Sequence, residues 1–143
     1  MASIHHETMV NLSAEQAWSA LRNVNIPHLL FAGVLIDGQV DGDVRTVTFV
    51  NGMTVRERII DISEERRRLA YSVIEGTPMT HHNASMQIVP DGPDSCRFVW
   101  IADFLPNEFG EQMLPLMEQG TEALKRNLES GAFAKAEAQA GVS

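Results

Sequence analysis

The sequence predicts one α+β domain, in which a curved seven-stranded antiparallel sheet wraps around a long C-terminal helix, with two short helices between the first and second strands. Three observations predict it. Apolar residues alternate with a period of two through the middle of the chain, helical spacing marks its ends, and Gly, Asn, Asp and Pro separate the alternating segments. A helix of about 22 residues, roughly 33 Å long, could lie across such a sheet and enclose a space with it.

The N-terminal region predicts a strand near residues 3–11 and then two short helices. Ser13 is a favoured N-cap, and Gln16 follows three residues later as in a capping box. A second short helix is expected over residues 27–31, because proline is well tolerated in the first turn of a helix.

The middle of the chain predicts six further strands joined as hairpins. Asn51-Gly52, between two alternating segments, is the strongest hairpin signal. The last two strands are expected at about residues 80–89 and 96–105, joined by the turn-forming segment PDGPDS. Asn107 can cap the long helix, whose apolar residues share one side. These residues are Phe109, Met113, Leu116, Met117, Gly120, Leu124 and Leu128.

Length, charge and cysteine content exclude several classes of protein. A chain of 143 residues suits one domain; we expect residues 1–130 to form a single ligand-binding domain and residues 131–143 to form a flexible C-terminal tail. A net charge of −8 argues against a nucleic-acid partner. The single cysteine, Cys96, allows no intramolecular disulfide. No apolar segment is long enough for a membrane span and the N-terminus does not resemble a signal peptide, so a cytoplasmic location is expected.

The order and spacing of five segments carry a resemblance to a known superfamily. The segments are AEQAWSAL, GDVRTVTFVNG, VRERIIDISEERRRLAYSV, CRFVWIADFLP and EALKRNLE. Over residues 3–129 the chain resembles the START/Bet v 1-like (SRPBCC, helix-grip) superfamily, and within it the bacterial polyketide cyclase/dehydrase-like proteins. The resemblance implies a hollow container for hydrophobic molecules such as polyketides, lipids, sterols and plant hormones; some members are cyclases or hydrolases.

Two histidine doublets raise the question of a metal site. Neighbouring residues in a strand point to opposite faces, so His81 and His82 cannot both face the interior. The apolar face of this strand contains Ala84 and Met86, which predicts that His82 points inward. His5 and His6 are expected at the surface, although strand parity could turn His6 inward. Without HExxH or Cys-rich spacing, we expect no metal and no cofactor.

For the strand at residues 96–105, the apolar pattern alone does not decide which face points inward. If Ile88 pairs with Arg97, then His82 faces Asp103 and the two could act as an acid/base pair. A slip of one residue would instead pair Asp103 with Asn83. Both faces of the strand are apolar, and the resemblance to plant hormone receptors favours the Asp103 side as the inner one.

Glu57 is the second acid expected to face inward, because side chains alternate between the two faces of a strand. In the superfamily that the chain resembles, a glutamate at this place often joins a polar network around the ligand. Arg45 is the expected cation at the edge of the sheet. The candidate catalytic residues are therefore His82, Asp103 and Glu57. The alternative is that His82 only orients a ligand or water. The two acids would then be structural partners of Arg45, Arg56, Arg58 or Tyr71.

The predicted ligand-binding residues line the space between sheet and helix. They are Val47, Phe49, Met53, Val55, Ile59, Tyr71, Val73, Ala84, Met86, Ile101, Phe109, Met113 and Met117. Residues 50–54 are the expected entrance. The expected partner is a hydrophobic, aromatic or polyketide-like small molecule, and the protein is expected to be a monomer or a homodimer.

Three functions remain open at this point. One is a binding or carrier protein, and another is a cofactor-independent polyketide cyclase, aromatase or dehydratase. The third is a co-chaperone-like interaction module, which would need an exposed apolar patch rather than a cavity. The strong alternation favours a lined cavity and ranks the module last.

Overall fold

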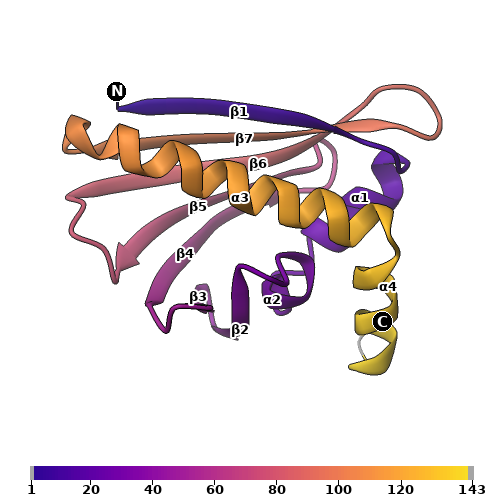
Figure 1. Cartoon of the computed structure of the whole chain (residues 1–143), viewed down its shortest axis with the longest axis horizontal. Coiled ribbons are helices and arrows are strands. Elements are labelled where there is room, and N and C mark those ends of the chain that lie inside the picture. The colour runs from indigo at the N-terminus through magenta and orange to yellow at the C-terminus, as the bar shows by residue number, and fades with distance from the viewer. Residues whose placement is uncertain (1, 142–143) are drawn as a thin grey trace.

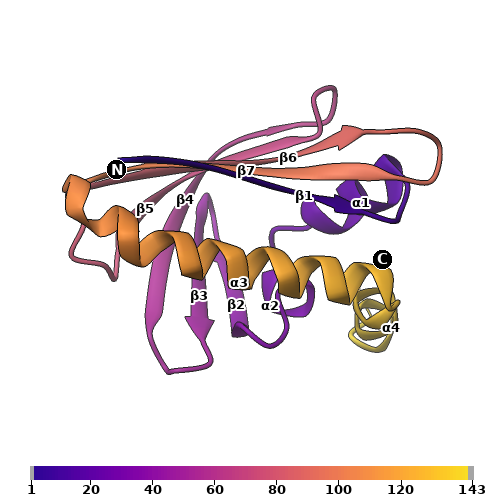
Figure 2. The same ribbon diagram turned by 45° about the horizontal axis from the view of Figure 1, so that its top comes forward.

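The computed structural model describes residues 2–141 and has the predicted α+β architecture. Seven antiparallel strands form one curved sheet in the order β1-β7-β6-β5-β4-β3-β2, and the long helix α3 runs across its inner face (Figures 1 and 2). The elements are β1 (Ser3–Val10), α1 (Ala14–Leu21), α2 (Pro27–Leu30), β2 (Leu35–Asp41), β3 (Val44–Phe49), β4 (Thr54–Ser63), β5 (Arg68–Glu75), β6 (His81–Pro90), β7 (Cys96–Leu105), η1 (Asn107–Phe109), α3 (Gly110–Glu129) and α4 (Ala132–Gln139).

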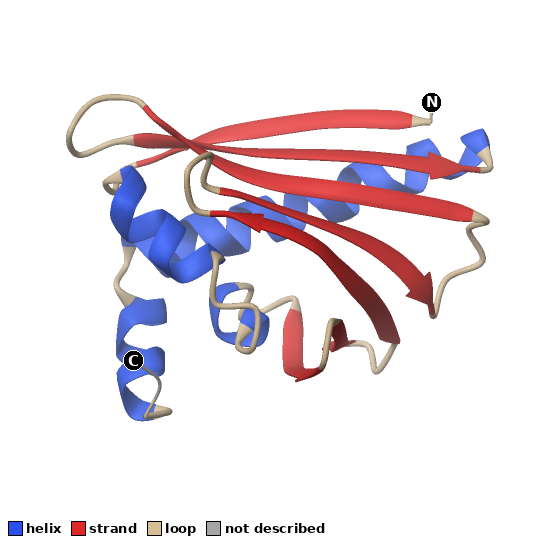
Figure 3. Cartoon of the chain, turned by 180° about the vertical axis from the view of Figure 1, so that it is seen from behind, coloured by secondary structure: helices blue, strands red, loops and turns tan. Residues whose placement is uncertain are grey.

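The two short helices are where the sequence places them, between β1 and β2. The Ser13 side chain accepts a hydrogen bond from the Gln16 backbone N–H at 3.2 Å, which confirms the predicted N-cap of α1. Pro27 opens α2. Seen from behind, both helices lie on the same side of the sheet as α3, near the end of the sheet that α4 also approaches (Figure 3).

The β3–β4 hairpin confirms the strongest turn signal in the sequence. Gly52 has a φ of +90°, a conformation that glycine adopts without strain, and the Asn51 side chain accepts a hydrogen bond from the Met53 N–H at 2.9 Å. This turn sets the register in which Val47 pairs with Val55.

The C-terminal region differs from the prediction at two places. Asn107 is the first residue of the 3₁₀ turn η1 and not the N-cap of the long helix, because α3 begins only at Gly110, with Phe109 at its N-cap position. The tail, expected to be flexible, contains the helix α4, which contacts α2 and α3. Phe133 in α4 is 5% exposed and belongs to the hydrophobic core.

The interior is solid under one half of α3 and hollow under the other. Leu124 and Leu128, on the C-terminal half, are buried in the same core as Val10 and Phe98. The N-terminal half of α3 lies instead over a cavity. In the described part of the chain, no helix combines the length and the apolar character that crossing a membrane requires.

Candidate functional site

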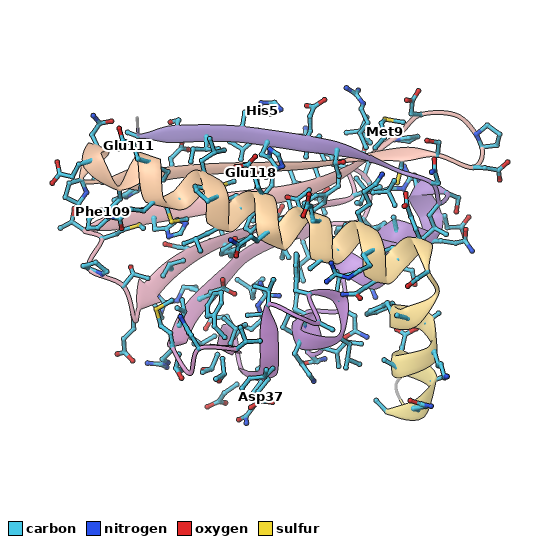
Figure 4. The ribbon with its side chains drawn as sticks, viewed as in Figure 1. His5, Met9, Asp37, Phe109, Glu111 and Glu118 are labelled. Atoms are coloured by element: carbon cyan, nitrogen blue, oxygen red, sulfur yellow. The ribbon has the colours of Figure 1, made fainter. Side chains whose placement is uncertain are left out.

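The candidate site is a cavity of about 330 Å³ between the inner face of the sheet and the N-terminal half of α3. This volume is within the range of small-molecule binding sites. Strands β2 to β7 contribute to its wall, together with η1, α3 and the loops at residues 51–53 and 77–79. Phe109 lies at the start of the helical segment that covers the cavity, and Glu118 lies further along it (Figure 4). Most of the wall is apolar.

Most residues predicted to line the space do line it. Those in the cavity wall are Val47, Phe49, Met53, Val55, Tyr71, Val73, Met86, Phe109, Met113 and Met117. Ala84 is buried and Ile59 packs against the core, but neither reaches the wall. Ile101 is on the opposite face of β7 and is 36% exposed, so its predicted inward orientation is wrong.

The predicted pairing of His82 with Asp103 is also wrong, because the register of β6 and β7 differs by one residue. His82 pairs with Phe104, and Asn83 pairs with Asp103. The cause is the connecting turn, which closes where the Asp91 N–H donates to the Ser95 carbonyl at 2.9 Å.

Compared with the prediction, the observed register exchanges the inner and outer faces of β7. Asp103 lies on the outer, exposed side, where its carboxylate accepts a hydrogen bond from the Ser3 hydroxyl at 2.5 Å. Ala102 and Trp100 occupy the cavity wall in its place.

His82 faces the cavity, as predicted, but has no carboxylate opposite it. Its ring packs edge-on against Phe104, with the ring centres 6.2 Å apart. Its Nδ1 atom is buried and has no hydrogen-bond partner within residues 2–141. Burial lowers the pKa of His82, and the nearby His81 lowers it further. The ring is therefore neutral at pH 7, with one nitrogen able to accept a proton. Neither histidine of the other doublet, His5 and His6, lines the cavity. His5 is on the edge strand β1, points away from the sheet and forms a hydrogen bond with the Glu7 carboxylate (Figure 4).

Arg45 and Glu57 form a buried ion pair in the cavity wall. They are cross-strand partners on β3 and β4, and Arg45 Nε donates to Glu57 Oε1 at 2.8 Å. Arg45 was expected at the edge of the sheet, but β2 forms that edge next to β3, and the Arg45 side chain, 7% exposed, points into the cavity wall. Among the suggested partners of Glu57, Arg45 is the one that binds it. Arg56 and Arg58 pair with Glu75 and Asp43 at the surface.

Tyr71 and Trp100 form a further polar contact in the wall, one that no pattern in the sequence predicts. Trp100 Nε1 donates to the Tyr71 hydroxyl at 3.2 Å, and the Arg45 guanidinium lies 5.8 Å from the centre of the Tyr71 ring. Burial raises the pKa of Tyr71 far above its ordinary value, and the charge of Glu57 adds to the effect. The hydroxyl is therefore protonated at pH 7. A small residue, Ala84, separates Tyr71 from β7 and leaves room for the contact.

The ionisable groups of the wall do not form a metal centre. Within the part of the chain that the structure describes, no three His, Cys, Asp or Glu side chains are grouped so that they could hold a metal ion. The available chemistry is that of an apolar chamber with an ion pair, an oriented phenol and a neutral imidazole.

A long helix across a curved antiparallel sheet, with a largely apolar cavity between them, defines a Bet v 1-like helix-grip protein. The chain belongs to the polyketide cyclase / dehydrase and lipid transport family, whose model matches residues 1–130. The superfamily expected from the sequence is thus confirmed. No curated protein matches the sequence.

Solved structures share the fold over nearly the whole chain. An uncharacterised protein from Bacillus thuringiensis has a TM-score of 0.81 at 18% identity, covering 89% of this chain and 98% of its own. XoxI from Bacillus cereus has a TM-score of 0.78 at 22% identity, covering 96% and 99%. Norcoclaurine synthase from Thalictrum flavum, in complex with dopamine and hydroxybenzaldehyde, has a TM-score of 0.68 at 26% identity, covering 96% and 86%.

Proposed function

We propose that the protein binds a hydrophobic, aromatic or polyketide-like small molecule in the cavity between the sheet and α3. The observation that carries the proposal is the cavity itself, of about 330 Å³ and with a mostly apolar wall. Two comparisons support it. The family description names polyketide cyclases, dehydrases and lipid transport, and the related norcoclaurine synthase is in complex with two aromatic compounds.

The wall suits an aromatic ligand of irregular shape. Met86, Met113 and Met117 contribute to it from the sheet and the helix, and methionine side chains adapt to irregular apolar surfaces. An aromatic ligand that buries about 200 Å² of its own surface would gain roughly 5 kcal/mol from leaving water. Part of this gain offsets the entropy lost on binding.

The entrance of the ligand is proposed at residues 50–54, opposite the first turns of α3. Met53 and Leu116 belong to the cavity wall and yet are 42% and 52% exposed, so they bridge the interior and the solvent. The loop at residues 77–79 also borders the cavity. An apolar rim of this kind would allow a hydrophobic molecule to enter without crossing a charged surface.

A cofactor-independent cyclase or dehydratase is the second candidate, and His82 is the observation that favours it. A neutral imidazole with an unpaired, buried nitrogen could accept a proton from an activated carbon next to a carbonyl group. Glu57, held by Arg45, would orient the substrate rather than exchange the proton. Asp103, on the outer face, takes no part in this second proposal.

The two tryptophans provide a test of where a ligand binds. Trp100 is in the cavity wall, whereas Trp18 is in α1 and donates to Glu64. We therefore expect an aromatic ligand to quench the fluorescence of the Trp18→Phe variant, which retains Trp100, and to leave that of the Trp100→Phe variant unchanged. Equal quenching of both variants, or of neither, would contradict binding in the cavity.

Turnover is tested separately with compounds that carry an enolisable carbonyl group. His82→Asn should abolish any product formation while ligand quenching persists. Asp103→Asn is the matched control and should leave the rate unchanged. A rate that persists in the His82→Asn variant would remove the histidine from the proposed chemistry.

A further inference from the structure

We propose that the ligand is an uncharged molecule with a carbonyl or hydroxyl oxygen, and that Tyr71 determines this specificity by donating a hydrogen bond to that oxygen. The inference rests on the proposed function and specifies the chemistry of its ligand. Two independent features carry it: a buried hydroxyl whose proton has no acceptor among residues 2–141, and a cavity wall whose charges cancel.

The first feature is the orientation of the Tyr71 hydroxyl. An indole N–H can only donate, so the hydroxyl oxygen is the acceptor in the 3.2 Å bond from Trp100 Nε1. The hydroxyl proton must therefore point away from Trp100. No residue in the described chain accepts it, and Tyr71 is 4% exposed. A buried donor without a partner is unfavourable, and an oxygen atom inside the cavity would remove the penalty.

The neighbouring charged groups do not provide this acceptor. Glu57 affects Tyr71 through its charge, but its Oε1 atom accepts from Arg45 and it forms no hydrogen bond with the phenol. Arg45 has only donors and lies over the face of the ring rather than beside the hydroxyl. The ion pair and the indole thus hold the ring in place and leave its O–H group for a ligand.

The second feature is the absence of an uncompensated charge in the wall. Arg45 and Glu57 are the permanently charged residues among those that line the cavity, and they neutralise each other. His82, Tyr71 and the polar side chains of the loops are uncharged at pH 7. A carboxylate or an ammonium group would lose its hydration without gaining a counter-charge, which is strongly unfavourable.

Four naphthalene derivatives of similar shape test the inference. Ethylnaphthalene is purely apolar, acetylnaphthalene adds a carbonyl oxygen, and naphthoate and naphthylmethylammonium add opposite charges. Dissociation constants are measured at pH 7 for the unmodified protein and for Tyr71→Phe, which keeps the ring and removes the donor. Tyr71 is the only tyrosine in the sequence, so isotope labelling of its Cζ atom also gives one NMR signal that reports on the hydroxyl without any mutation.

The preference for acetylnaphthalene over ethylnaphthalene, expressed as the ratio of their dissociation constants, should fall roughly five- to tenfold in the Tyr71→Phe variant. The Cζ signal should shift with acetylnaphthalene much more than with ethylnaphthalene. Both charged compounds should bind at least about tenfold more weakly than acetylnaphthalene.

Each contrary result has a different meaning. An unchanged ratio together with equal Cζ shifts would overturn the role of Tyr71, while binding of ethylnaphthalene would leave the proposed container intact. Naphthoate or naphthylmethylammonium binding as tightly as acetylnaphthalene would overturn the requirement for an uncharged ligand. If none of the four compounds binds, the proposed function itself fails, and this inference fails with it.

Discussion

Arg45 on β3 and Glu57 on β4 are direct cross-strand partners, and their side chains meet at 2.8 Å inside the cavity rather than at the surface. Both groups have lost most of their hydration, so each depends on the other. The pair also fixes the surroundings of Tyr71, because the Arg45 guanidinium lies over its ring. It therefore contributes to the shape of the cavity as well as to its neutrality.

Removing either partner of this pair should be much worse than removing both. Arg45→Met or Glu57→Met leaves one buried charge without compensation and should lower the free energy of unfolding by about 3–5 kcal/mol. The double variant, with two apolar side chains, should recover most of that loss. Urea denaturation of the three variants measures this coupling.

The exposed pair formed by Arg58 and Asp43 is the matched control, because both side chains are at least half exposed. Arg58→Met should change the stability by less than about 1 kcal/mol. A loss in the double variant at residues 45 and 57 that equals the sum of the two single losses would mean that the two side chains act independently.

Tyr71 should make the protein sensitive to alkali. Burial raises its pKa in the folded state, so its contribution to stability is complete below the unfolded pKa of about 10 and is lost as the pH rises above that value. Tyrosinate absorbance should therefore appear together with unfolding and not before it. Because the chain has a single tyrosine, this absorbance reports on Tyr71 alone. A smooth titration near pH 10 in a still folded protein would contradict the burial of the hydroxyl.

His82 should make the protein sensitive to acid. Its pKa in the folded state is lowered, chiefly by burial, so the stability it contributes is present above the unfolded pKa of about 6.5 and is lost as the pH falls below it. The slope can reach about 1.4 kcal/mol per pH unit. Urea denaturation between pH 7 and pH 5 should show a smaller slope for His82→Leu than for the unmodified protein. The exposed neighbour His81, replaced by Gln, should leave most of the slope in place.

The inner face of β6 could be predicted from the sequence, whereas that of β7 could not. On β6, Ala84, Met86 and Ile88 alternate with polar residues, so parity alone turns His82 inward. On β7 both faces are apolar, and the choice depends on the register. The register in turn depends on where the turn between Asp91 and Ser95 closes. A shift of one residue in this register exchanges the inner and outer faces of β7.

The two polar contacts in the cavity also differ in whether they could be predicted from the sequence. The Arg45–Glu57 pair follows from the hairpin at Asn51-Gly52, because the turn that pairs Val47 with Val55 also places the two charges opposite each other. The contact between Tyr71 and Trp100 joins β5 to β7 across β6. Predicting this contact requires the correct register of both hairpins, and an error in either register places the two residues on different faces of the sheet.

Gly120 should control the width of the cavity. A Cβ atom at this position of α3 would lie 3.0 Å from Trp100 Cζ3. Gly120→Ala should therefore push the indole away from the helix and disturb its hydrogen bond to Tyr71, while the better helix propensity of alanine, about 1 kcal/mol, offsets part of the strain. We expect weaker binding of aromatic ligands with a small change in stability. Unaltered affinity and Trp100 fluorescence would show that the indole has room to move.

The helix α4 should stabilise the domain although its composition resembles a flexible tail. Small residues dominate residues 131–141, and only Phe133 among them is a large apolar side chain; its burial in the core against the α2–α3 region holds the segment in place. Phe133→Ala should lower the free energy of unfolding by about 3 kcal/mol, whereas Lys135→Ala, at an exposed position of the same helix, should have little effect. Truncation after Ser130 should reproduce the loss seen with Phe133→Ala, because the remaining residues of α4 bury little apolar surface. If urea denaturation gives the same stability for the truncated and the full-length chain, α4 does not pack on the domain in solution, and the flexible tail predicted from the sequence would be the better description.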